Sequence, residues 1–243
     1  MNRRLIGFLA LALVALLLAG CRDSNSPFPL DPDLRFGYRL HLESEGLAGA
    51  ENLESFAVNL PPQNIDGVTA TPRLFADGKI IYYAEDKTGI RETAFRDLDS
   101  DVTPAGADQY VLRYPLTPGA HWRGPGRTIL LTQKSLFSKA YLFSKALPAT
   151  IGLDLDYIVG NLESVHVPAG NFDCVKVTAT GRTSVTAIDI QSTLDITVEI
   201  AEWYAPGIGL VKSIRTEKAG IERAGNAKLV TELDYFKKPG WFE

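Results

Sequence analysis

The sequence predicts a mainly β protein with a strongly curved antiparallel sheet, either a half-barrel or an open barrel. Three observations predict this fold. Apolar and polar residues alternate in about ten segments, which is the pattern of half-buried strands. Residues typical of tight turns separate these segments, so consecutive strands are expected to pair antiparallel. About ten strands are more than a flat open sheet holds without curling, which is why curvature is expected.

The first alternating segment begins at Leu34 and is typical of those that follow. Leu34, Phe36 and Tyr38 fall on one face of a strand, and Arg35 and Arg39 fall on the other. Further strands are predicted at residues 79–84, 90–96, 109–114, 128–132, 155–167, 172–180, 194–204, 208–216 and 228–236.

Two turns between these segments have a specific chemistry. Asp77-Gly78 suits a tight hairpin turn. The segment Ala205-Pro206-Gly207-Ile208 suits a type II turn, because proline fixes φ at the second position and glycine supplies a positive φ at the third.

One short apolar insertion does not follow the strand pattern. Residues 135–147 contain the sequence LFSKA twice, six residues apart. Whether this segment forms a strand or a helix, apolar side chains lie on more than one side of it, so the pattern does not decide between the two conformations. The insertion is either a local duplication, buried in the core or packed on the sheet, or a mobile apolar lid that faces a ligand or a membrane. The lid hypothesis makes Leu136, Phe137, Tyr141, Leu142 and Phe143 the candidate ligand-binding residues.

The first 20 residues have the layout of a secretory signal peptide. Two arginines precede an apolar run over residues 5–18, which is shorter than the roughly 20 residues that a spanning helix needs. The run ends in Leu18-Ala19-Gly20-Cys21, which resembles a bacterial lipobox. This resemblance implies a diacylglycerol-modified, N-acylated Cys21, carrying fatty acids such as palmitate, as the first residue of the mature chain. We therefore expect a signal peptide over 1–20, a lipidated Cys21 with a flexible tether over 21–33, and a single β-rich domain over 34–243.

The predicted anchor indicates where the protein resides. Several acyl chains on one residue exceed the threshold for stable membrane attachment. Arg22 follows Cys21, in place of the aspartate of an inner-membrane retention signal, which favours the cell outer membrane with the domain facing the periplasm. Cleavage removes two of 25 basic residues and none of 29 acidic residues, which leaves a net charge of −6. No nucleic-acid partner is expected, because such a partner requires a basic face.

The sequence contains none of the common catalytic motifs. Nucleophile elbows, HExxH, Walker A, CxxC and glycine-rich dinucleotide patterns are all missing. His41, His121 and His166 are far apart, and we interpret each as a strand-surface or loop residue. Lipidation of Cys21 leaves Cys174 without a disulfide partner, which favours a buried and inert thiol. We expect no enzymatic activity and no cofactor.

An acidic segment has a weak likeness to a calcium-binding loop. Asp97, Asp99 and Asp101 alternate, and Asp108 stands at the twelfth position. The glycine and the glutamate that such a loop uses are missing from their positions. We therefore interpret the segment as a solvated acidic loop and predict no metal site.

Three segments of the second half carry a resemblance to a known family. They are YPLTPGAHW at 114–122, VHVPAGNFDCVKV at 165–177 and WYAPGIGLVKS at 203–213. Together they resemble the TapB-like bacterial lipoproteins, whose curved sheet is related in shape to the LolA/LolB lipoprotein carriers. The resemblance implies a concave apolar face that binds a lipid, an acyl chain or an envelope protein partner. The alternative is a structural or assembly lipoprotein of the outer membrane, with a filled core and no ligand.

Overall fold

The computed structural model describes residues 25–44, 50–107, 109–131, 151–187, 192–220 and 226–238. Within these residues, 14 antiparallel strands form one continuous sheet with two short branches. The strands are β1 (Arg35–Ser44), β2 (Glu51–Asn59), β3 (Gln63–Ile65), β4 (Val68–Phe75), β5 (Ile80–Asp86), β6 (Gly89–Arg96), β7 (Thr103–Pro104), β8 (Tyr110–Arg113), β9 (His121–Arg127), β10 (Gly152–Val167), β11 (Gly170–Ala187), β12 (Ser192–Ala205), β13 (Gly209–Ala219) and β14 (Asn226–Lys237).

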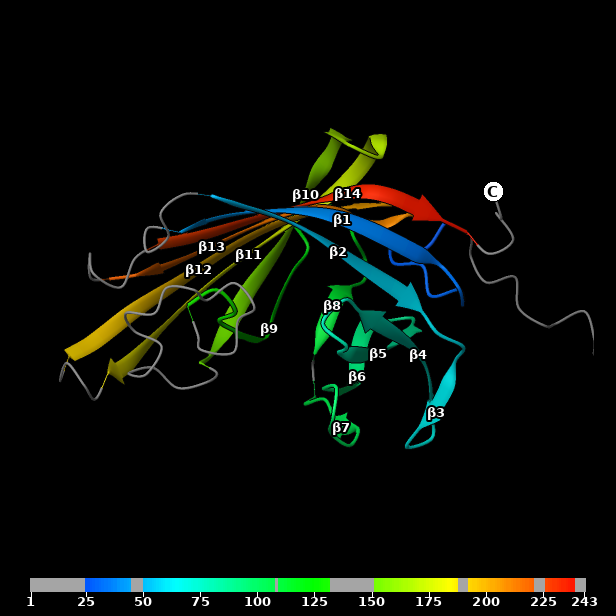
Figure 1. Cartoon of the computed structure of the whole chain (residues 1–243), viewed down its shortest axis with the longest axis horizontal. Coiled ribbons are helices and arrows are strands. Elements are labelled where there is room, and N and C mark those ends of the chain that lie inside the picture. Colours follow the sequence, from blue (N-terminus) through cyan, green and yellow to red (C-terminus); the bar gives the residue numbers. More distant parts are fainter. Residues whose placement is uncertain are drawn as a thin grey trace, which may run out of the picture.

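The sheet is bent into two parts that face each other (Figure 1). The strand order is β7-β6-β5-β4-β2-β1-β14-β13-β12-β11-β10-β9, with β3 paired to β4 and β8 paired to β6. We call β1, β2 and β9–β14 the main sheet, and β3–β8 the lobe. The two parts are joined by a short pairing of β2 with β4, over Ala57–Asn59 and Arg73–Phe75. Since β7 and β9 are not paired with each other in the described residues, the prediction of a curved, open antiparallel sheet is confirmed.

Both predicted turns have the expected geometry. Gly78 has a φ of 80° at the β4–β5 turn, and Gly207 has a φ of 71° at the β12–β13 turn. The Ile208 N–H donates to the Ala205 carbonyl oxygen at 3.1 Å, which closes the turn. Positive φ at these positions explains why glycine occupies them.

Several strands of the structure do not match the sequence pattern. β2, β3, β4 and β7 were not predicted, and the strand expected at 128–132 lies instead at His121–Arg127. Most of β2 is solvated on both faces, so its apolar and polar residues do not alternate. β9 contains Gly124-Pro125-Gly126, which argues against a strand in the interior of a sheet. It is tolerated here because β9 is the last strand in the order.

The main hydrophobic core lies between the lobe and the concave face of the main sheet. Tyr83 and Ile90 of the lobe pack in one cluster with Val159, Val177 and Tyr204 of the main sheet. This packing joins the lobe to the main sheet, and an unfilled space between them lies beside the cluster.

A second cluster contains the free cysteine. Cys174 is fully buried with Val167, Trp203 and Leu233, and the turn before β11 is tied down by an Ala169 N–H that donates to the Leu233 carbonyl oxygen at 3.0 Å. Burial raises the pKa of the Cys174 thiol to about 11. The prediction of a buried thiol is confirmed, and its chemical inertness stays a prediction.

The segment before β1 is packed into the fold. We call residues 26–31 the strap, because they cross between the main sheet and the lobe. Phe28 and Leu30 are 5% and 4% exposed and belong to the core. The ring of Phe28 meets that of Tyr83 edge-on, with 5.0 Å between the centroids.

Hydrogen bonds to the backbone of the strap hold it in place. Asn59 Nδ2 donates to the carbonyl oxygens of Pro29 (3.1 Å) and Asp31 (2.9 Å), and the Gly207 N–H donates to that of Ser26 (2.9 Å). The sequence predicts a flexible tether up to residue 33, and the structure differs for residues 26–31. The reason is that burial of Phe28 and Leu30, which alternate with prolines, outweighs the conformational entropy lost when the segment is ordered.

Candidate functional site

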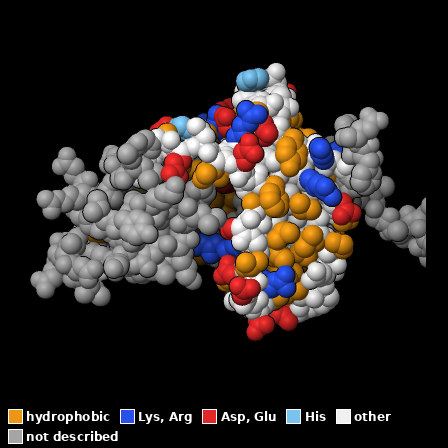
Figure 2. Space-filling view, viewed as in Figure 1, with side chains coloured by type: hydrophobic (Ala, Val, Ile, Leu, Met, Phe, Trp, Pro, Cys, Tyr) orange, Lys and Arg blue, Asp and Glu red, His pale blue; other side chains and the backbone are white. Residues whose placement is uncertain are grey.

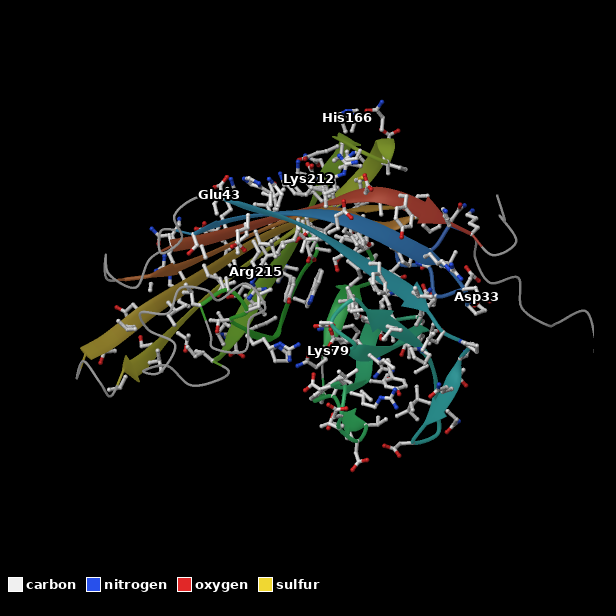
Figure 3. The ribbon with its side chains drawn as sticks, in the orientation of Figure 1. Asp33, Glu43, Lys79, His166, Lys212 and Arg215 are labelled. Atoms are coloured by element: carbon white, nitrogen blue, oxygen red, sulfur yellow. The ribbon has the colours of Figure 1, made fainter. Side chains whose placement is uncertain are left out.

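A cavity of about 470 Å³ lies between the concave face of the main sheet, the lobe and the strap. Its volume is within the range of roughly 300–1,000 Å³ that is typical of small-molecule sites. Figure 3 shows Arg215 on the underside of the main sheet, toward the lobe, whereas His166 and Lys212 lie above the sheet. The aromatic side chains of the lining are Phe28, Tyr38, Phe75, Tyr83, Tyr110, Tyr157 and Tyr204, and the charged ones are Arg73, Glu92, Arg127, Glu202 and Arg215. Residues 55–57 of β2 also border the cavity, with the Phe56 side chain on the opposite face of the strand.

One wall of the cavity carries a carboxylate and a guanidinium on adjacent strands. Tyr204 Oη donates to Glu202 Oε2 at 2.7 Å, and both side chains belong to β12. Burial raises the pKa of Glu202, and the neighbouring Arg215 of β13 reduces that rise. Burial and the Glu202 carboxylate together raise the pKa of Tyr204 well above its ordinary value. Glu202 is therefore easier to protonate than a carboxyl in water.

The lobe contributes a second carboxyl of the same kind. Burial raises the pKa of Glu92, on β6, and the charges of Arg127 and Lys79 oppose that rise. Among the described residues, no hydrogen bond joins Glu92 to Glu202, so the structure does not show an acid–base pair. The expectation that the protein is not an enzyme stays a prediction.

The strap side of the cavity holds a buried cation. Arg73 is 5% exposed, and its guanidinium lies 4.2 Å from the ring centroid of Phe28 and 4.7 Å from that of Phe36. Its Nε donates to Asn59 Oδ1 at 2.7 Å, and its Nη2 donates to the Pro29 carbonyl oxygen at 3.0 Å. In the described part of the chain, no carboxylate forms an ion pair with it. Arg73 therefore brings a positive charge without a negative partner to the cavity wall.

Tyrosines beside Arg73 keep their protons. Burial raises the pKa of Tyr38 to about 12, although the positive charge of Arg73 acts in the opposite direction. Burial also raises the pKa of Tyr83. Both hydroxyls are therefore neutral. The Tyr38 hydroxyl donates to the Leu210 carbonyl oxygen at 3.4 Å, and the Tyr83 hydroxyl can donate a hydrogen bond to a ligand.

A buried ion pair closes the far side of the cavity. Arg215 Nε donates to Glu217 Oε1 at 2.7 Å, and Glu217 is fully buried. The Glu217 carboxylate also accepts the backbone N–H groups of Ile129 (2.8 Å), Leu130 (3.0 Å) and Leu131 (3.2 Å). Arg215 Nη2 donates to the Arg127 carbonyl oxygen. These contacts fix the chain that follows β9 against β13.

The histidines and the acidic segment predicted to be inert are at the surface. His41 Nδ1 and His166 Nδ1 each lie 2.8 Å from an asparagine oxygen, and His121 is exposed. Asp97, Asp99 and Asp101 are also exposed. The described residues contain no group of three or more histidine, cysteine or acidic side chains that could hold a metal. In the same residues, no helix has both the length and the apolarity to cross a membrane.

Other predicted site residues lie outside the described residues. These are Cys21, Asp108 and the five candidates of the apolar insertion, Leu136, Phe137, Tyr141, Leu142 and Phe143. The sequence reasoning missed the cavity residues, most of which come from eleven strands and the strap. The one signal for them is a set of charged residues at positions where alternation requires an apolar side chain, such as Arg73, Glu202 and Arg215.

Part of the chain matches a protein family by sequence. A family model described as DUF3108-like matches residues 155–223, which include most of β10 and all of β11–β13. Two of the three segments that resemble the TapB-like proteins, at 165–177 and 203–213, fall within this range. No curated protein matches the sequence. The TapB-like resemblance and its relation to LolA/LolB stay predictions.

Three solved structures resemble the chain. A protein described as exported, with a YmcC-like fold, from Bacteroides fragilis has 15% identity and a TM-score of 0.46, covering 87% of this chain and 98% of its own. A protein described as a lipoprotein, from Parabacteroides distasonis, has 12% identity and a TM-score of 0.42, covering 89% of this chain and 100% of its own. The hypothetical lipoprotein YmcC of Escherichia coli has 13% identity and a TM-score of 0.34, with coverages of 96% and 97%.

Proposed function

We propose that the protein is a non-catalytic lipoprotein of the cell envelope that binds a lipid or another acyl-chain ligand in the cavity. The observation that carries this proposal is the cavity of about 470 Å³ between the main sheet and the lobe, whose lining combines aromatic and aliphatic side chains with a few charged ones. Sites for small ligands are concave and mostly apolar, with few polar groups that fix orientation. The lipobox supports acylation of Cys21 and attachment to the outer membrane, with the domain in the periplasm.

The charges of the cavity favour a ligand with an anionic group. Three arginines line the cavity, Arg73, Arg127 and Arg215, against two carboxyls. The two carboxyls on the walls, Glu92 and Glu202, have raised pKa values and lose their negative charge first as the pH falls. Because Arg215 is paired with Glu217, the positive charge of the lining comes from Arg73 and Arg127, and it is in excess wherever Glu92 or Glu202 is protonated. A fatty acid or a phospholipid combines such an anionic group with acyl carbons that suit the aromatic walls.

Native mass spectrometry tests the proposal. Residues 22–243 are exported to the periplasm without the Cys21 anchor and purified without detergent. We expect a reproducible excess mass that corresponds to a fatty acid or a phospholipid. A clean apo mass, together with no uptake of added lipid, would overturn the ligand-binding proposal and favour the assembly alternative.

A matched pair of variants locates the ligand. Ser55, on β2, lines the cavity, whereas Ser164, on β10, is exposed. Ser55→Trp places an indole in the cavity, and Ser164→Trp adds the same side chain in solvent. We expect the excess mass to disappear in Ser55→Trp and to persist in Ser164→Trp. Retention of the lipid in both variants, with far-UV circular dichroism unchanged, would place the ligand elsewhere.

A further inference from the structure

One end of the main sheet is the end at which the strap enters the fold. β1 begins there, and the pairing registers place Arg35 opposite Lys237 of β14 and opposite Val58 of β2. The β12–β13 turn is at the same end, where the Gly207 N–H donates to the Ser26 carbonyl oxygen. Figure 3 shows Asp33 at this end and Glu43 near the opposite end of β1. We call the end that contains Arg35 the anchor end.

A short stretch of chain separates the anchor end from the cysteine of the lipobox. Cys21 precedes Ser26 by five residues, and five residues span at most about 18 Å when fully extended. β11 has 18 residues and is therefore about 60 Å long, at about 3.3 Å per residue. Since the strap is docked from Ser26 onward, an acylated Cys21 keeps the anchor end beside the bilayer. The opposite end of the sheet is too far away to take its place.

Aromatic and basic side chains lie together on the outer face of the sheet at the anchor end. Phe56 and Tyr235 are 44% and 41% exposed, and both pair with Gly37, so their side chains are on the same face. Arg35 and Lys237 are exposed two residues nearer to the end. We call Arg35, Phe56, Tyr235 and Lys237 the anchor-end patch. Figure 2 shows hydrophobic side chains over this region with Lys and Arg side chains beside them.

The two cations of the anchor-end patch are not neutralised by the fold. Arg35 and Lys237 are directly opposite on adjacent strands, an arrangement of like charges that destabilises a sheet. Among the described residues, neither forms an ion pair with a carboxylate. Arg39, farther along the same strand, pairs with Asp234 at 2.7 Å, and Lys228 near the opposite end pairs with Glu43 at 3.6 Å. The patch therefore fits an anionic surface.

We propose that the anchor-end patch docks on the bilayer that carries the acylated Cys21. Tyr235 and Phe56 enter the headgroup region, where amphipathic rings are favoured, and Arg35 and Lys237 contact anionic lipid phosphates. The inference rests on the lipid anchor of the proposed function and is independent of the cavity ligand. It assigns the protein a fixed orientation, with the strap and the adjoining cavity wall next to the membrane.

Quenching of a fluorescent label by the lipid tests the orientation. The full chain is purified from bacterial membranes and reconstituted in vesicles of phosphatidylglycerol and phosphatidylethanolamine with brominated acyl chains. Lys238→Cys places an NBD label beside the patch, and Lys218→Cys places it near the opposite end of the sheet. Both lysines are exposed, and Cys174 is buried, so labelling is directed to the new thiol. We expect quenching of the label at position 238 and none at position 218.

Charge-removing variants test the contribution of the patch. Each basic residue near an anionic surface contributes about 1 kcal/mol, equivalent to about a fivefold change in a binding equilibrium. Arg35→Gln/Lys237→Gln is therefore expected to lower the docked-to-undocked ratio about 25-fold in the Lys238→Cys background. Arg182→Gln/Lys218→Gln removes two cations toward the opposite end and is expected to leave quenching unchanged. An equal loss in both double variants would overturn the role of the patch.

The intact mass of the same preparation separates the two ways in which the inference can fail. Equal quenching at positions 238 and 218, in protein that carries the mass of the acyl chains, overturns docking and leaves the lipid anchor standing. A mass without acyl chains overturns both the anchor and the docking. Association of two copies through the patch would appear as energy transfer between labelled chains without quenching by brominated lipid, and it also overturns docking on the bilayer.

Discussion

Glu217 is the position where a minimal substitution should have a large effect on folding stability. Its carboxylate is fully buried and accepts four hydrogen bonds, from the backbone of residues 129–131 and from Arg215 Nε. Each carboxylate oxygen accepts two of them. Glu217→Gln keeps the shape of the side chain but replaces one oxygen with an NH₂ group, which cannot accept a hydrogen bond. Two donors, each buried or partly buried, then lose their partner.

The size of the effect follows from the number of donors left unpaired. Each buried donor without a partner costs about 1–3 kcal/mol, so the loss of two predicts a destabilisation of about 4 kcal/mol. The whole folding free energy of a domain is about 5–15 kcal/mol. For a chain of this length, a loss of about 4 kcal/mol lowers Tm by about 8–16 °C.

Urea denaturation and calorimetry of residues 22–243 measure the change. Glu199→Gln is the matched control, because Glu199 is 52% exposed and its contact with Lys218 is a surface ion pair. Such a pair contributes about 0–1 kcal/mol, so Tm of the control should stay close to that of the wild type. Equal stability of Glu217→Gln and Glu199→Gln would refute the reasoning that the buried carboxylate is needed by the donors around it.

Three further changes test other contacts. Arg73→Met removes the hydrogen bond to the Pro29 carbonyl oxygen and the contacts with the aromatic rings. If this lowers the free energy of opening the strap by about 1.4 kcal/mol or more, limited proteolysis should cut the strap at least tenfold faster. Arg123→Met, at an exposed position, should be cut at the wild-type rate. Burial raises the pKa of Glu202, so its contribution to stability is present below the ordinary carboxyl pKa of 4.5 and is lost as the pH rises through the raised value. The stability of Glu202→Gln relative to wild type should therefore increase from pH 4 to pH 8, and a difference that is flat with pH would contradict this. Cys174 is fully buried with a pKa raised to about 11, so Ellman's reagent should label it at pH 8 in urea only, and fast labelling of the native protein would show that the site opens.

The strands that were predicted correctly are those in which local sequence and tertiary environment agree. In β10–β14, side chains alternate between the core and solvent or a second cluster, and the β10–β11 and β12–β13 turns contain glycines with positive φ. Strands β2, β4 and β9 were missed because their environment is not periodic. β4 buries Arg73 in an aromatic surrounding, and β9 contains a proline that is tolerated at an edge.

The cavity could not be predicted from the sequence, because its residues are near each other only after the sheet has bent. Glu92 and Glu202 are 110 positions apart, and the burial that raises both pKa values comes from the packing of the lobe against the main sheet. The candidate ligand residues chosen from the apolar insertion lie outside the described residues and stay a prediction. The sequence therefore does not show which residues far apart in the chain lie close together in space.

The sequence by itself determined the class of fold, the lipobox and the absence of common catalytic motifs, because each of these is written in residues that are adjacent or periodic. Tertiary structure alone decided that the strap is buried, that three arginines and two carboxyls share one cavity, and that Arg35 and Lys237 lie side by side. The physical reason is strand pairing. The order and register of the strands bring together residues as far apart in the chain as Arg35 and Lys237, and a local pattern does not encode that register.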